Sequence, residues 1–167
     1  AAESNVEKCQ KLLERIKKGI KILMNADEDS NVIKAFRWMN RAMIWQQQRS
    51  KTPVRKWQRT GNERNINYVL EGLDDAGSQI FKSLEQFQHN SKRGRWRPFQ
   101  LAFILINIES VINPDSNERD IVDLIWFPTG GGKTEAYLGL TAFSIFYRRL
   151  KGMKDWNWEE YGGTAAI

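Results

Sequence analysis

A glycine-rich loop between two apolar segments constrains this chain more than any other feature. Three consecutive glycines, Gly130–Gly132, follow the strand-like run Ile121–Trp126 and precede the strongly apolar helix candidate at residues 135–150. Such a loop turns tightly and points successive backbone N–H groups inward, with no side chain in the way of an anion. The positive end of the following helix dipole faces the same point. The order of strand, glycine loop and helix predicts a phosphate-binding loop.

The two residues after the glycines, Lys133 and Thr134, supply the chemistry expected of such a loop. We expect Lys133 to reach the β- and γ-phosphates and the hydroxyl of Thr134 to coordinate Mg²⁺. The alternative is a flexible glycine joint, but a joint does not require Lys-Thr behind it. One position departs from the general pattern, because Phe127 stands where the pattern has glycine.

A second motif, Arg97-Pro98-Phe99-Gln100, lies 33 residues before Lys133. It resembles the Arg-Pro-aromatic-Gln signature of superfamily 2 helicases, and residues 128–134 match the phosphate loop of that superfamily. In these helicases the glutamine recognises adenine, because its amide offers both a donor and an acceptor. The resemblance therefore implies ATP as the nucleotide, with Gln100 on the base. The alternative is an ordinary helix N-terminus with Pro98 in its first turn.

The rest of the chain favours an α/β fragment. Residues 1–95 read as a helical accessory region, with amphipathic helices at about residues 12–23 and 32–48 and further helices at about 65–87. Residues 96–167 read as the beginning of a RecA-like domain, with a first strand, the phosphate loop, a first helix and the start of a second strand at residues 162–167. A complete nucleotide-hydrolysing core needs about five parallel strands. We therefore expect a fragment that is inactive by itself.

Charge and composition narrow the partners. The net charge is +6, and the cations cluster at residues 49–59 and 92–97, which makes nucleic acid a natural partner; the alternative is a solvated surface. One cysteine and one histidine exclude an internal disulfide and a multi-cysteine zinc site. No signal peptide opens the chain, and no run approaches the roughly 18 apolar residues of a membrane span. These features predict a cytoplasmic protein without membrane contact, and the first residue, Ala1, suggests a piece of a longer one.

Four of the tryptophans raise a choice between packing and base stacking. Trp38 and Trp45 lie seven residues apart on one expected helix face, which predicts core positions. Trp57 and Trp96 each stand within a basic cluster, where stacking on bases is the alternative. We expect these two to serve in packing as well.

Four patches together resemble one family, the large helicase subunits of DISARM anti-phage systems (the DrmA-like family). They are Phe36–Met43, Arg95–Ala102, Trp126–Leu140 and Gly162–Ala165. The resemblance implies an ATP-dependent DNA helicase or translocase that works with partner subunits of a defence system. It also implies that the acidic Walker B motif and the second motor lobe lie beyond Ile167.

By residue match, the resemblance implies a nucleotide site of eight residues, of which Lys133 and Thr134 are catalytic and Thr134 is the metal ligand. The set is Arg97, Gln100, Thr129, Gly130, Gly131, Gly132, Lys133 and Thr134. The alternative function is a regulatory P-loop NTPase, in which the helical region recruits a protein and nucleic acid plays no part.

Overall fold

A computed structural model describes residues 2–49, 57–62, 65–70, 95–126 and 130–155 of the chain. Within these ranges the elements are α1 (Ala2–Asn25), α2 (Asn31–Arg49), β1 (Trp57–Asn62), β2 (Asn65–Leu70), α4 (Pro98–Ile112), the short 3₁₀ helix η2 (Asn117–Asp120) and α5 (Lys133–Asp155). Two compact units result. The first combines residues up to Met43 with the described residues from Trp96 onward, and the second lies between them in the sequence.

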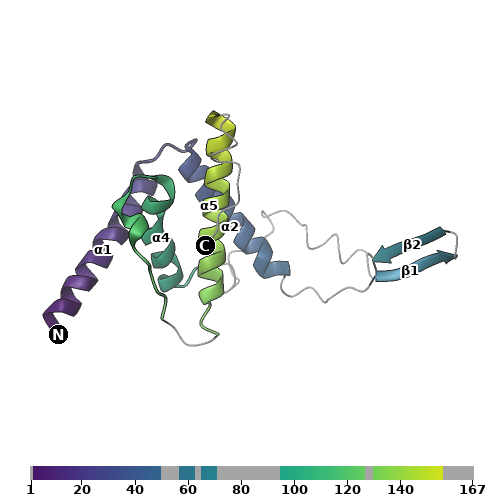
Figure 1. Cartoon of the computed structure of the whole chain (residues 1–167), viewed down its shortest axis with the longest axis horizontal. Helices are drawn as coiled ribbons and strands as arrows, with labels where there is room; N and C mark the ends of the chain where they lie inside the picture. The colour runs from purple at the N-terminus through teal and green to yellow at the C-terminus, as the bar shows by residue number, and fades with distance from the viewer. Residues whose placement is uncertain (1, 50–56, 63–64, 71–94, 127–129, 156–167) are drawn as a thin grey trace. The chain divides into compact units, whose positions relative to one another are not determined.

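Helix α4 is the centre of the first unit, where α1 and α5 both pack against it (Figure 1). Its apolar run Phe103–Ile106 is buried on several sides because α2 contributes to the same core. The largest fully buried side chains are Met39, Ile104, Ile108 and Phe143. Each contributes about 1.5–3 kcal/mol by leaving water. None of the described helices, α4 included, is long and apolar enough to cross a bilayer.

Trp96 joins α2 to α5 just before α4 begins. Its indole N–H donates to Oδ1 of Asn40 at 2.7 Å. Its ring lies against Gly139 of α5, so close that a Cβ at that position would lie 2.6 Å from the ring carbon Cη2. The packing role predicted for Trp96 is therefore confirmed.

The core positions predicted for the two α2 tryptophans are wrong. Trp38 and Trp45 are both exposed by more than a third, although Trp38 makes an edge-to-face contact with Phe146. The buried row of α2 runs through Ala35 and Met39, and the tryptophans lie to one side of it. The side chain of Trp57 lies outside the described residues.

The second unit contains a β-hairpin where the sequence predicted helix. Strands β1 and β2 pair antiparallel, with Trp57 opposite Leu70 and Asn62 opposite Asn65. The side-chain oxygen of Asn62 accepts a hydrogen bond from the backbone N–H of Asn65 at 3.0 Å, which closes the turn. Residues 65–68 alternate polar and apolar types, and Val69 and Leu70 extend the run with apolar residues, a composition that favours a strand. The helix expected over 65–87 is thus wrong for 65–70, and the remainder lies outside the described residues.

The strand expected at Ile121–Trp126 does not form. No described residue pairs with it, and a strand exists only through hydrogen bonds to a neighbouring strand. Exposure nevertheless alternates, because Val122, Leu124 and Trp126 are 94%, 80% and 88% exposed while the intervening side chains face the helices. The helical character expected of the N-terminal region is confirmed for α1 and α2, whereas an α/β arrangement around the loop is not formed by the described residues.

The remaining expectations about organisation stay predictions. The second strand expected at 162–167 lies outside the described residues. The division into a region 1–95 and a motor domain 96–167 also remains a prediction. In the structure, α1 and α4 share one core across that boundary.

Candidate functional site

The glycine loop, Gly130–Gly132, lies at the N-terminus of α5, which begins with Lys133. Gly130 and Gly132 have φ angles of +79° and +86°, in the left-handed region that other residues rarely adopt. A Cβ at Gly130 would meet nothing within 4 Å, whereas one at Gly132 would lie 2.6 Å from Nε2 of Gln100. Glycine is therefore required at 130 by conformation and at 132 by conformation and space together.

Arg97 and Gln100, at the start of α4, bind the carbonyl groups of the glycine loop. Nη1 of Arg97 donates to the carbonyl oxygen of Gly131 at 2.8 Å, and Nε2 of Gln100 donates to that of Gly132 at 2.7 Å. A third hydrogen bond fixes the orientation of the Gln100 amide: its Oε1 accepts from the backbone N–H of Arg97 at 2.8 Å. The structure thus brings the two sequence motifs together into one site.

These two hydrogen bonds determine which way the loop's donors face. A trans peptide group holds its C=O and its N–H on opposite sides. Because the carbonyls of Gly131 and Gly132 point toward α4, the N–H groups of Gly132 and Lys133 point away from it. Those N–H groups open the first turn of α5, where the helix dipole adds positive potential. The geometry therefore fits an anion such as a phosphate on the side of the loop opposite α4.

The other predicted site residues lie near this point. Lys133 is half-buried as the first residue of α5, and Thr134 is exposed beside it. Thr129 lies outside the described residues. Glu135, which the sequence analysis did not single out, places its carboxylate against the loop: a Cβ at Gly132 would lie 3.3 Å from its Oε2. An acidic residue in a first helical turn is common, so the sequence offers no signal for this position.

Gln100 is positioned for more than the loop contact. It is only 5% exposed, and its amide uses one donor and one acceptor within the protein. A glutamine amide has two N–H donors and two acceptor lone pairs, so the hydrogen bonds to described residues use one of each. The alternative drawn from sequence is also correct, because Pro98 is the first residue of α4. Helix start and loop contact are two roles of the same four residues.

A second group of charged residues, missed by the sequence analysis, holds the segment before the loop. Nη1 and Nη2 of Arg15, on α1, each donate to one carboxylate oxygen of Asp123 at 2.7 Å. Nη2 also donates to the carbonyl of Ile106 at 3.3 Å, and Nε to Oε2 of Glu118 at 3.3 Å. The hydrogen bond to Asp123 raises the pKa of Arg15 above its ordinary value against the effect of burial, so the guanidinium stays charged.

Comparison with known proteins gives one close relationship. Over all 167 residues the chain is 37% identical to DISARM protein DrmA of Bacillus paralicheniformis, and it spans 13% of that protein. The DrmA-like resemblance drawn from the sequence is therefore confirmed, over a small part of the relative's length. No family model matches the chain, and no solved structure matches it.

Proposed function

We propose that this chain carries the ATP-binding loop of a DNA helicase or translocase that acts in DISARM defence. The observation that supports the proposal is the pair of hydrogen bonds from Arg97 and Gln100 to the carbonyls of Gly131 and Gly132. They join an adenine-recognition motif of helicase type to a loop whose donors face outward at a helix N-terminus. The sequence relationship to DrmA supplies the defence context.

Each proposed role follows from where the residue lies. The N–H groups of Gly132 and Lys133 bind phosphate oxygens, assisted by the dipole of α5. The ammonium of Lys133 reaches the β- and γ-phosphates, and the exposed hydroxyl of Thr134 holds the metal. Magnesium, when bound, neutralises charge on the phosphate oxygens. Gln100 offers its remaining donor and acceptor to the adenine edge, and Arg97 fixes the loop on which these contacts depend.

The rest of the motor is proposed to lie in the remainder of the parent protein. Hydrolysis needs an acidic metal-binding residue on another strand and a completed parallel sheet around Ile121–Trp126. The spanned share of DrmA, 13%, leaves ample chain for both. We therefore propose a RecA-like domain that begins here, with DNA and other defence subunits as partners and no activity in these 167 residues alone. A motor that acts on DNA inside a bacterial cell works in the cytoplasm.

The test is ATP turnover by the full-length parent, with and without single- and double-stranded DNA, compared with its Lys133→Ala variant. We expect DNA to stimulate turnover and the substitution to lower it by about 10²–10³-fold, the cost of removing one group that stabilises transition-state charge. Lys17→Ala, an exposed lysine paired with Glu14 on α1, is the matched control and should leave turnover unchanged. Turnover indifferent to DNA would favour the regulatory NTPase instead. If the parent neither hydrolyses nor binds ATP, both the DNA motor and the regulatory NTPase are refuted.

A further inference from the structure

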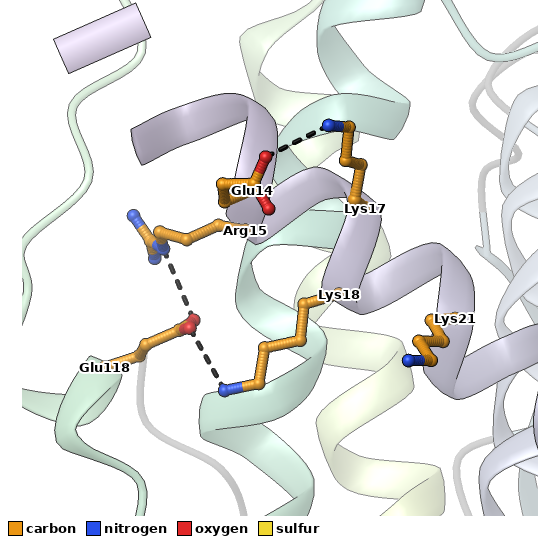
Figure 2. Close-up of a pocket in the computed structure, with 6 residues that line it drawn as sticks. All are labelled: Glu14, Arg15, Lys17, Lys18, Lys21 and Glu118. Carbon is orange, nitrogen blue, oxygen red and sulfur yellow. Dashed lines mark hydrogen bonds and ion pairs between the residues drawn. The ribbon is translucent and has the colours of Figure 1, made fainter. Parts of the chain in front are cut away.

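A groove of about 380 Å³ lies along α1, beside the start of η2. Six residues line it, five of them on α1, and all are shown in Figure 2: Glu14, Arg15, Lys17, Lys18, Lys21 and Glu118. Four cations and two carboxylates line it, and most of them form ion pairs. Lys17 pairs with Glu14 at 3.0 Å, and Glu118 lies between Arg15 at 3.3 Å and Lys18 at 3.4 Å. The ion pairs of Glu118 with Arg15 and Lys18 therefore join α1 to the chain after α4.

The contact of this group nearest to the glycine loop is Arg15 with Asp123. We call residues 118–126 the approach segment, because they lead from η2 toward the loop. Both guanidinium Nη atoms lie 2.7 Å from the carboxylate of Asp123, seven residues before Gly130. The two side chains are only 11% and 13% exposed. Paired, parallel N–H donors of this kind fix orientation as well as distance, which a single charge does not.

Two further contacts hold the approach segment on its helical side. At its start, Nη1 of Arg119 donates to the carbonyl oxygen of Ser110, on α4, at 2.9 Å. Ile125 packs against the core cluster formed by α4 and α5. Val122, Leu124 and Trp126 face solvent and contribute almost no burial. Among the contacts described for residues 121–126, the position of the chain therefore depends on the side chain of Ile125 and on the carboxylate of Asp123, and the second of these depends on α1.

We infer that Arg15 is a positioning residue for the nucleotide site: by holding Asp123 and Glu118, it makes the affinity of the glycine loop depend on the docking of α1. The inference takes its ligand from the proposed function, but its geometry is independent of it. Arg15 lies on a helix outside both sequence motifs and acts only through the approach segment.

The expected effect follows from population arithmetic. A nucleotide binds when the loop and its approach segment are in the competent arrangement, and the apparent affinity falls in proportion to the fraction of molecules so arranged. Without Arg15 that fraction falls, because Asp123 is left without its bidentate partner in a poorly solvated position. Once nucleotide is bound, the arrangement is restored. KM should therefore rise while kcat is retained.

The first experiment uses the full-length parent with Arg15→Gln. This change keeps a polar side chain but removes the positive charge and the paired Nη donors that bind Asp123. We expect KM for ATP, and the dissociation constant for a fluorescent ATP analogue, to rise about fivefold, with kcat within about twofold of wild type. The control is Lys17→Gln, two residues further along the same helix, whose ion pair among the described residues is with Glu14. An unchanged KM, or a loss of kcat at constant KM, would overturn the inference.

A second measurement, amide hydrogen exchange without nucleotide, separates this inference from the proposed function. Arg15→Gln should speed exchange several-fold in the approach segment and at residues 130–135, and leave the middle of α4 unchanged. Equal acceleration throughout the unit would mean a general loss of stability and would overturn the inference. If Arg15→Gln does not fold, Asp123→Asn serves instead, because it leaves Arg15 bound to Glu118 and Ile106. A parent that binds no nucleotide would refute the proposed function. The exchange measurement would still show whether Arg15 fixes the approach segment.

Discussion

The glycine loop and the segment before it are held by two helices with different chemistry. Helix α1 fixes the approach segment through side-chain carboxylates, because Arg15 binds Asp123 and Glu118; we call these contacts the α1 hold. Helix α4 fixes the loop through backbone carbonyls, because Arg97 and Gln100 donate to the carbonyl oxygens of Gly131 and Gly132; we call these two bonds the α4 hold. The first hold requires particular acidic residues in its partner segment. The second is made to backbone atoms, and the close approach of Gln100 requires glycine at position 132.

The largest expected effect removes the α1 hold alone. Gly19 lies where α1 touches α4, and a Cβ there would collide with the carbonyl oxygen of Leu105 and lie 2.9 Å from its carbonyl carbon. A backbone group cannot move aside as a side chain does, so Gly19→Ala should destabilise the docking of α1 by about 3 kcal/mol. Hydrogen exchange on the full-length parent should show faster exchange in residues 15–25, with the start of α4 still protected. Lys21→Ala, exposed two residues further on, is the control, and equal exchange in the two variants would contradict the close approach.

The next effect removes one of the two bonds by which α4 binds the loop. Gln100→Glu keeps the acceptor for the N–H of Arg97 but replaces the donor to Gly132 by an oxygen that faces another oxygen. An unpaired buried carbonyl costs about 1–3 kcal/mol, so ATP binding should weaken about tenfold, and a preference for ATP over GTP should narrow if the amide also contacts adenine. Titration with both nucleotides measures each. The control is Gln46→Glu, at an exposed position of α2, which should alter neither the affinity for ATP nor the preference for ATP over GTP. If Gln100→Glu lowers the affinity but leaves the preference unchanged, Gln100 binds the loop and the helix start but not adenine.

A smaller effect separates the start of α4 from the loop itself. Trp96→Phe keeps an aromatic ring against Gly139 but removes the N–H that donates to Asn40. The expected cost is about 1 kcal/mol, with faster exchange at residues 95–101 and a rise in KM for ATP below twofold. Trp38→Phe, on a ring with an edge contact to Phe146, should change less. A larger rise in KM than that of Gln100→Glu would mean that the indole, and not the amide, dominates the α4 hold.

The smallest effect depends on pH and concerns α1 again. Burial lowers the pKa of Lys18, but hydrogen bonding and charge from Glu109 and Glu118 together outweigh it and raise this pKa above 10.5. A raised pKa of a base stabilises the folded state fully below the unfolded value, and that stabilisation is lost as pH rises through the folded value. The difference in thermal midpoint between wild type and Lys18→Met should therefore be constant from pH 8 to about 10 and shrink above 10.5. A difference that shrinks below pH 9 would point to another group.

The same comparison explains what could be predicted from the sequence. The α4 contacts come from four contiguous residues, so the sequence pattern singles out Arg97 and Gln100 as site residues. It does not predict their bonds to the loop carbonyls 32 to 34 residues further on, because the pattern assigns Gln100 to adenine. The α1 hold joins residues that are 103 and 108 positions apart in the sequence. Arg15 itself looks like any other cation on an amphipathic helix. Nothing local distinguishes it, because its role depends on which segment is folded beside it.

Elements differ in the same way. Helices α1 and α2 were predictable because a helix forms its hydrogen bonds within its own segment. The run at Ile121–Trp126 was read as a strand from its apolar character, but a strand depends on neighbours, and none is described beside it. The sequence does not predict the hairpin of β1 and β2, because β1 shows no two-residue period and in β2 that period extends only over residues 65–68.

The contact between Trp96 and Gly139 also has a consequence for how related chains vary. A glycine in the interior of a helix costs about 1 kcal/mol relative to alanine, so α5 gains nothing from Gly139 except room for the indole. The two positions divide one fixed volume between them. In homologous chains an alanine or larger residue at 139 should therefore accompany a smaller side chain at 96, and the sizes at these positions should rise and fall in opposition.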